Sequence, residues 1–326
     1  ADTAETSAVV DVDPCRVDVR IPTDFVLPPG GVHLRWPDPP QGQERRMHQY
    51  KVYAALAYAR ANGLNHVVYD SPRARLGIIT CGKAYLDVRQ ALDDLGIDAD
   101  VAGAIGLRLY KVGMVWPLEA EGVRHFSEGL DEILVVEEKR PIVEYQLKEQ
   151  LYKLPPATRP TVIGKYGDRD EWTPPHGGWL LPPTGDLTPS LLARVIAAWL
   201  APFYTSERIR DRLALIAATE RTVAAPHLRL KREPWFCPGC PHNLSTRVPA
   251  GSCALAGVGC HLMAMWAGRD TLVVSQMGGE GVAWLGLAGS TGTRHVFVNM
   301  GDGTYYHSGV LAIRAAVAAN VNVTYK

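Results

Sequence analysis

Residues 295–319 read HVFVNMGDGTYYHSGVLAIRAAVAA. The apolar run at 295–300 predicts a β-strand, and the stretch 310–319 predicts an α-helix that begins after a glycine-containing turn. A strand followed by a helix is the repeating unit of an α/β fold, in which helices cover a parallel sheet. Ligands of such sheets bind beyond the carboxyl ends of the strands, so the turn is the first candidate for a binding site.

Gly301, Asp302 and Gly303 form that turn, and its chemistry suits a phosphorylated ligand. Two glycines let a diphosphate approach the backbone closely, and the free N–H groups of the following helix attract phosphate oxygens. The Asp302 carboxylate can bind Mg²⁺, which prefers oxygen ligands and bridges diphosphates. A plain turn is the alternative, because Asp-Gly is also a common turn pair.

A second glycine-rich loop precedes this one in the chain. The run 271–275 predicts a strand, and Gly278, Gly279 and Glu280 follow it in the loop MGGEG. Such a loop at a strand end suits close contact with a flat or phosphorylated ligand. A tight turn between a strand and a helix is the alternative explanation of the same residues.

The stretch after this loop also follows the α/β pattern. Residues 280–288 predict a helix, and residues 321–325 alternate like a new strand that stops at Lys326. A parallel sheet would be left with an open edge there, so we expect the domain to be truncated at its C-terminus. The chain also lacks a starting Met, which indicates a fragment or a processed product.

Four of the six cysteines fall in the segment 237–260, which begins CPGCPHN. Cys237 and Cys240 have the spacing of an iron–sulfur or a zinc site, and Cys260 is a candidate third ligand. Cys253 stands between small residues and is expected to be a packed position. A fourth ligand has to come from outside this segment. Clustered cysteines in a chain without a secretory signal indicate metal or redox chemistry in a reducing cytoplasm.

Upstream, the residues from 64 to 154 alternate between short apolar runs and amphipathic stretches. The predicted strands are 76–80, 108–112 and 132–136, and the predicted helices are 83–95, 118–129 and 141–151. This repetition predicts a parallel sheet with helices on its faces. Outside it, the predicted elements are a helix at 44–62, a Pro-rich connector at 155–189 and helices at 190–201 and 206–218. The charge run 137–140 is expected to be a solvated loop or an interface.

The composition narrows the function classes. The 326 residues carry a formal net charge of zero, which gives no electrostatic case for binding nucleic acid or an anionic membrane. No apolar run reaches the ~18–20 residues that span a bilayer, and the N-terminus has no secretory signal. We therefore expect a protein that binds neither nucleic acid nor membrane.

Three long segments carry a resemblance to a known family. FCPGCPHNLSTRVPAGSCALAGVGCH, QMGGEGVAWLG and HVFVNMGDGTYYHSGVLAIRAAVAANVNVTYK together resemble the indolepyruvate:ferredoxin oxidoreductases in their long fused form. Upstream, RLGIITCGKAYLDVRQALDDLGI, RLYKVGMVWPLE and LDEILVVEEKRPIVEYQLKEQLY resemble that family's transketolase C-terminal-like domain.

The resemblance implies an α/β architecture in four parts. Residues 1–63 would be an irregular linker with the first helix, and 64–154 the transketolase C-terminal-like parallel-sheet domain. Residues 155–234 would be the Pro-rich connector with its helices. Residues 235–326 would be a thiamine-diphosphate-binding α/β domain, present in part.

The resemblance also implies roles for single residues. Six would lie along thiamine diphosphate, with Asp302 also binding Mg²⁺: Gly278, Gly279, Glu280, Gly301, Asp302 and Gly303. Three thiolates would hold a [4Fe–4S] cluster: Cys237, Cys240 and Cys260. His242 is a candidate catalytic residue that would face cofactor or substrate, with capping or packing in the loop as the alternative.

The implied reaction is the oxidative decarboxylation of a 2-oxo acid, indolepyruvate or another aryl pyruvate, to an acyl-CoA. Coenzyme A is the implied co-substrate and ferredoxin the implied electron acceptor, in a homodimeric enzyme. The alternatives are a non-oxidative thiamine-diphosphate decarboxylase and a zinc-stabilised α/β module that only binds a partner. The activating glutamate and the remaining metal ligands are expected outside this chain, which is therefore expected to be inactive alone.

Overall fold

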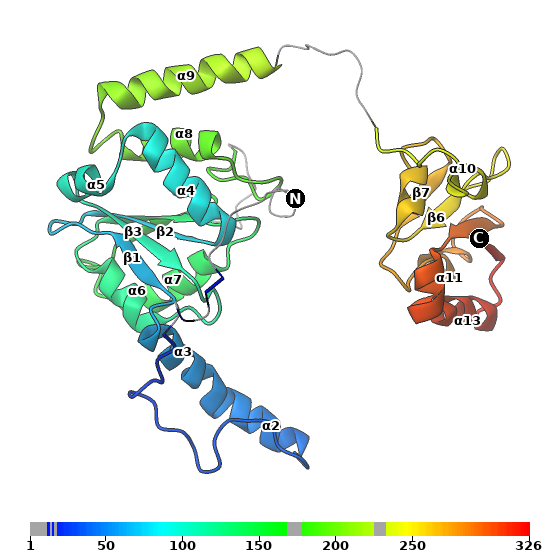
Figure 1. Ribbon diagram of the computed structural model, residues 1–326, viewed down its shortest axis with the longest axis horizontal. Helices are drawn as coiled ribbons and strands as arrows, with labels where there is room; N and C mark the ends of the chain where they lie inside the picture. The colour runs from blue at the N-terminus through cyan, green and yellow to red at the C-terminus, as the bar shows by residue number, and fades with distance from the viewer. Residues whose placement is uncertain (1–11, 14, 16–17, 168–177, 225–232) are drawn as a thin grey trace. The chain divides into compact units, whose positions relative to one another are not determined.

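A computed structural model describes residues 12, 13, 15, 18–167, 178–224 and 233–326. The chain divides into two compact units, Ala1–Ala225 and Pro226–Lys326, and each is considered by itself (Figure 1). Parts of the expected N-terminal linker, of the Pro-rich connector and of the segment before the cysteines lie outside the described residues.

Unit 1 is built on a five-stranded sheet. Its strands are β1 (His66–Tyr69), β2 (Leu76–Cys81), β3 (Leu107–Val112), β4 (Glu132–Val136) and β5 (Thr161–Ile163), in the order β1-β3-β2-β4-β5. All neighbouring pairs are parallel except β1 with β3. The run LGIIT forms the central strand, as its continuous apolar character predicts, because both faces of that strand are buried.

Helices cover both faces of this sheet. They are α4 (Gly82–Leu95), α5 (Ala99–Ile105), α6 (Ala120–Ser127), α7 (Val143–Leu151), α8 (Pro189–Leu200) and α9 (Glu207–Ala224). Figure 1 shows α4, α5, α8 and α9 on one side, with α6 and α7 on the other. The side chains of Ile78 and Ile79 alternate between the two faces, and each joins a separate apolar core.

The segment predicted as a Pro-rich connector is part of this unit. Strand β5 pairs with β4, and the side chains of Leu181 and Leu187 are buried in the core beneath α8. Sequence patterns missed β1, α5 and β5, which are short and lack a clear period. The first helix begins at Pro40, earlier than predicted, and ends at Ala61 as α2 (Pro40–Arg46), η2 (Met47–Lys51) and α3 (Val52–Ala61). The four-part division of the chain stays a prediction.

Unit 2 contains a four-stranded, fully parallel sheet. Its strands are β6 (Ala254–Ala256), β7 (Thr271–Val274), β8 (Val296–Asn299) and β9 (Val323–Tyr325), in the order β7-β6-β8-β9. The helical segments are α10 (His242–Ser245), η3 (Cys260–Ala264), α11 (Val282–Leu287) and a continuous run of α12 (Asp302–Thr304), η4 (Tyr305–Gly309) and α13 (Val310–Ala318).

The parallel α/β architecture predicted for both halves of the chain is confirmed. The one strand of unit 2 that the sequence did not predict is β6, and it lies between β7 and β8. A small core forms around Leu255, Trp284, Val296 and Val298. Because β6 is central, its carboxyl end brings the loops of its two neighbours together.

Candidate functional site

Three loops meet at the carboxyl edge of the unit 2 sheet. They follow β6, β7 and β8, which are adjacent and parallel, so their ends lie side by side. The loop after β6 is 257–261, the loop after β7 is 275–281 and the loop after β8 is 300–303. Two of the three are the glycine-rich loops that the sequence analysis selected, and the third holds Cys260.

Glycines make the close approach of these loops possible. A Cβ added at Gly257 would overlap the carboxylate of Glu280, and one added at Gly278 would overlap the side chain of Ser308. Gly278 also has φ +92°, a conformation that other residues rarely adopt. The packing of the loops therefore requires glycine at these two positions, whether or not a ligand binds there.

Glu280 is completely buried, with no exposed surface. Its Oε2 accepts a hydrogen bond from the N–H of Gly278 at 2.7 Å, and its backbone oxygen accepts one from the Tyr325 hydroxyl at 3.2 Å. Its Oε1 has no hydrogen-bond partner among the described residues. Burial raises the pKa of Tyr325, and the charge of Glu280 adds to that shift.

His261 is a buried residue of the site that the sequence analysis did not select. Only 2% of its surface is exposed, and Nε2 accepts a hydrogen bond from the N–H of Gly257 at 3.2 Å. Burial lowers the pKa of His261, and the nearby charge of Glu280 opposes that shift. Its position next to Cys260 in the segment GVGCH was the available signal, since a polar side chain there interrupts an apolar stretch.

The GDG turn lies where the sequence predicted, between β8 and a helix. The backbone oxygen of Gly301 accepts a hydrogen bond from the N–H of Tyr305 at 2.9 Å, which starts the helical run. The carboxylate of Asp302 is exposed at the first helical position. The turn and its setting are thus observed, whereas its role toward a ligand stays a prediction.

The cysteine segment forms a tight turn. The N–H of Cys240 donates to the backbone oxygen of Cys237 at 3.0 Å, and the side-chain amide of Asn243 donates to both backbone oxygens at 3.2 Å. Cys237 and Cys260 are exposed, and Cys240 is half-buried. Cys253 precedes β6, at the opposite end of that strand from Cys260, and contacts the core as predicted for a packed position.

A column of aromatic rings joins the cysteine turn to the loop after β6. The ring of His242 stacks on Phe236 with centroids 5.7 Å apart, and on His261 with centroids 6.4 Å apart. Nδ1 of His242 lies 3.2 Å from the Sγ of Cys240. The candidate catalytic residue His242 is therefore held within the cysteine turn, close to the loop that carries Cys260.

The fit of metals and cofactors to this edge is uneven. Among the described residues, no three His, Cys, Asp or Glu side chains form a group arranged to hold a metal ion. The cysteines thus lie on neighbouring loops without a ready set of donors. Unpartnered buried polar atoms at the strand ends favour a polar ligand: Oγ of Ser275, Oε1 of Glu280 and Nδ2 of Asn299.

Unit 1 has a buried charged cluster at the carboxyl edge of its own sheet. The carboxylate of Glu137 accepts hydrogen bonds from the N–H groups of Ile142, Val143 and Glu144 at 2.9, 2.9 and 3.0 Å. Burial raises the pKa of Glu137, and burial lowers the pKa of Lys165, whose ammonium donates to the backbone oxygen of Glu137. The expectation of a solvated charge run is therefore wrong for Glu137, which is buried because it caps the start of α7.

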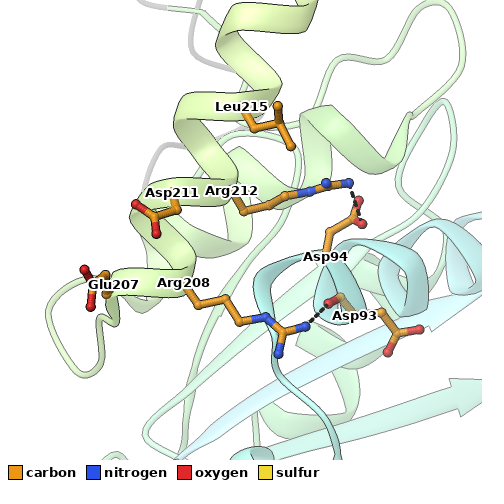
Figure 2. Close-up of a pocket in the computed structure, with 7 residues that line it drawn as sticks. All are labelled: Asp93, Asp94, Glu207, Arg208, Asp211, Arg212 and Leu215. Carbon is orange, nitrogen blue, oxygen red and sulfur yellow. Dashed lines mark hydrogen bonds and ion pairs between the residues drawn. The ribbon is translucent and has the colours of Figure 1, made fainter.

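A cavity of about 590 Å³ lies in unit 1 between the end of α4 and the start of α9 (Figure 2). Its polar lining consists of Asp93, Asp94, Glu207, Arg208, Asp211 and Arg212. The guanidinium of Arg212 pairs with the Asp94 carboxylate at 2.7 Å, and that of Arg208 donates to the backbone oxygen of Asp93 at 3.5 Å. Both cations are thus engaged in holding α9 on α4, and no residue predicted for catalysis lines this cavity.

Fold and site together define an α/β protein whose two units are each built on a mainly parallel sheet. In unit 2 the glycine-rich loops and the cysteine turn lie at the carboxyl edge of the sheet. Residues 65–226 match the family model described as the indolepyruvate ferredoxin oxidoreductase middle domain. The chain belongs to the indolepyruvate ferredoxin oxidoreductase family.

Relatives with a curated name support this assignment. The "Indolepyruvate oxidoreductase subunit IorA" of Methanothermobacter marburgensis is 28% identical over an alignment of 274 residues, and the alignment covers 79% of this chain and 38% of the relative. The protein of the same name from Thermococcus kodakarensis is 26% identical over an alignment of 270 residues, and the alignment covers 77% of this chain and 37% of the relative. The chain therefore spans little more than a third of the length of these relatives.

Two solved structures are also similar to the chain. One is a split-gene transketolase, an inactive β4 tetramer, with 15% identity and a TM-score of 0.27 over 47% of this chain and 41% of that one. The other is the 2-oxoglutarate:ferredoxin oxidoreductase of Magnetococcus marinus, with 17% identity and a TM-score of 0.28 over 48% and 23%. Scores this low carry no argument about the arrangement of the units. Within the described residues, no helix is long and apolar enough to cross a membrane.

Proposed function

We propose that this chain is part of an enzyme that oxidatively decarboxylates an aryl pyruvate such as indolepyruvate to an acyl-CoA and passes the electrons to ferredoxin. The observation that carries the proposal is the meeting of three loops, after β6, β7 and β8, beside a cysteine turn. Membership of the family supports the substrate class. The activity belongs to the whole protein, since the chain matches about a third of its relatives' length.

Thiamine diphosphate and Mg²⁺ are the cofactors that we assign to the strand edge. When bound, the thiazolium ring takes up the electron pair that decarboxylation releases. Gly301 and Gly303 leave the backbone open to a diphosphate, and the exposed carboxylate of Asp302 is free to hold the metal. Gly279 and Glu280 are buried, so in this proposal they shape the cofactor cleft from beneath, with Gly278 in contact with Ser308.

The cysteine turn is proposed to hold an iron–sulfur cluster with thiolates from Cys237, Cys240 and Cys260. Support comes from the ring column, which places His242 and His261 between the two cysteine-bearing segments. None of the six cysteines, all in the described part of the chain, forms a disulfide. This agrees with a reducing cytoplasm, which we propose as the location, together with a homodimeric assembly and ferredoxin as the electron acceptor.

The test of the cofactor assignment uses the intact enzyme, titrated with thiamine diphosphate in the presence and absence of Mg²⁺. Wild-type protein should bind the cofactor only with the metal present. The variant Asp302→Ala should lose this Mg²⁺-dependent binding, while Asp270→Ala, a change of an exposed aspartate before β7, should retain it. Unchanged binding by Asp302→Ala would remove the metal role of this residue.

The test of the cluster assignment is anaerobic reconstitution with iron and sulfide. We expect a broad absorption in the visible range, lost in a Cys237→Ala variant and retained in Cys253→Ala. A colourless protein with stoichiometric zinc would instead favour the zinc-stabilised binding module. Cofactor binding without a cluster would favour a non-oxidative decarboxylase.

A further inference from the structure

The loop after β6 presents a hydrogen-bond donor that the proposed function has not used. Nε2 of His261 accepts the hydrogen bond from the N–H of Gly257, at 3.2 Å. An imidazole nitrogen that accepts a hydrogen bond carries a lone pair, so the ring proton of neutral His261 is on Nδ1. This ring therefore has one defined donor, and its direction follows from the position of the ring.

The edge of the His261 ring that carries Nδ1 and Cε1 lies beside two glycines, one of which belongs to the GDG turn. A Cβ at Gly301 would lie 3.8 Å from Nδ1 and 3.6 Å from Cε1, and a Cβ at Gly259 would lie 2.9 Å from Nδ1. Because neither position has a side chain, this edge of the buried ring is not blocked by a Cβ from the loop after β6 or from the GDG turn. No described residue accepts a hydrogen bond from the Nδ1–H.

The ring is held in this orientation from both sides. Gly257, which donates to Nε2, lies against the buried carboxylate of Glu280 and has no room to move toward it. The ring of His242 stacks on the His261 ring at an interplanar angle of 27°. A donor that is fixed before the ligand arrives loses little conformational freedom on binding, which is how binding sites gain affinity.

We infer that His261 is a further cofactor-binding residue, whose Nδ1–H donates a hydrogen bond to an oxygen of the diphosphate held at the Gly301 turn. The inference rests on the proposed function and deepens it. A hydrogen bond to a charged oxygen is stronger than one between neutral groups. Loss of the donor should therefore weaken diphosphate binding about tenfold or more.

The experiment compares His261→Leu, which removes the donor, with His261→Asn, whose amide N–H replaces Nδ1–H, in the intact, cluster-reconstituted enzyme. The probes are thiamine diphosphate and inorganic diphosphate, each titrated calorimetrically with Mg²⁺ present. We expect His261→Leu to bind both probes about tenfold more weakly, and His261→Asn to bind them within about threefold of wild type. The two probes separate a contact to the diphosphate from a contact to the thiamine rings.

Several results would overturn the inference. One is unchanged affinity of His261→Leu for both probes; another is a loss confined to thiamine diphosphate, which would place the contact on the rings. If His261→Leu loses visible cluster absorption or thermal stability as well as affinity, the affinity of His261→Asn for the two probes is the deciding measurement. If His261→Asn then loses as much affinity as His261→Leu, the result counts against the inference. A wild-type enzyme that fails to bind thiamine diphosphate would contradict the proposed function itself, a result distinct from all of these.

Discussion

The buried carboxylate of Glu280 lies directly against the Cα of Gly257, and this contact joins the loop after β7 to the loop after β6. The same glycine donates its N–H to His261, whose ring lies beside Gly301 in the loop after β8. Three chain segments that carry the candidate site are thus linked through one residue without a side chain. A substitution of Gly257 should therefore alter the positions of all three loops.

The first prediction concerns Gly257→Ala. The added methyl group would overlap the Glu280 carboxylate, so we expect unit 2 to lose about 1–3 kcal/mol of stability. Hydrogen exchange of the β6 and β8 amides measures this loss. Gly286→Ala is the matched control, because a Cβ there meets nothing within 4 Å and Ala favours the helix. Equal exchange rates in Gly257→Ala and wild type would contradict the prediction, because they would show that the loops can move apart to accept the methyl group at no cost in stability.

The second prediction concerns the thiol of Cys81 at the end of β2. Burial raises its pKa from 9.0 to about 11, with further contributions from the charges of Glu137 and Glu138. At pH 9.0 its alkylation should be about fifty-fold slower than that of an unperturbed thiol, since far less thiolate is present. The thiol ionises more readily in the unfolded chain, where its pKa is 9.0, than in the folded one, where it is about 11. Unit 1 therefore loses stability as the pH rises from 9.0 through about 11.

Peptide mapping after timed alkylation measures the Cys81 rate. Cys237, which is exposed, provides the internal comparison in protein without a cluster. Alkylation of Cys81 as fast as that of Cys237 at pH 9.0 would contradict the shielding of this thiol.

The third prediction tests whether the segment after β5 belongs to unit 1. Ile196 of α8 is fully buried in the core that contains Ile78 and Leu92, so Ile196→Ala should cost about 2–5 kcal/mol. Leu215→Ala on α9 is the control, since that side chain is 53% exposed and its loss should stay within about 0.5 kcal/mol. Chemical denaturation monitors both. A detachable connector would instead show similar, small losses for the two variants.

The fourth prediction concerns the ion pair in the cavity of Figure 2. The side chain of Arg212 is 36% exposed and that of Asp94 is 17% exposed, so solvent screens their attraction. A double-mutant cycle with Arg212→Gln and Asp94→Asn should give a coupling of at most about 1 kcal/mol. The coupling should shrink as salt is raised. A larger, salt-independent coupling would indicate a role beyond attaching α9 to α4.

Local patterns predicted much of this architecture. The strand at 295–300, its GDG turn and the following helix were recognisable because a period, two glycines and a helix start stand next to one another. The cysteine turn was recognisable for the same reason. By contrast, β6 has only three residues, ALA, and no local period distinguishes it from a loop. It is a strand because β7 and β8 supply hydrogen bonds on both sides.

The site divides in the same way. Residue types and spacing alone selected Asp302, the glycine loops and three cysteines as candidates. Only the tertiary structure could show that Glu280 is fully buried against Gly257, or that the ring of His261 accepts a hydrogen bond from Gly257 and lies beside Gly301. These relationships join residues from different strands, and they depend on which strands are neighbours. The residue types and their spacing can be recognised from consecutive residues, whereas burial and the contacts of a side chain depend on how the strands assemble into the sheet.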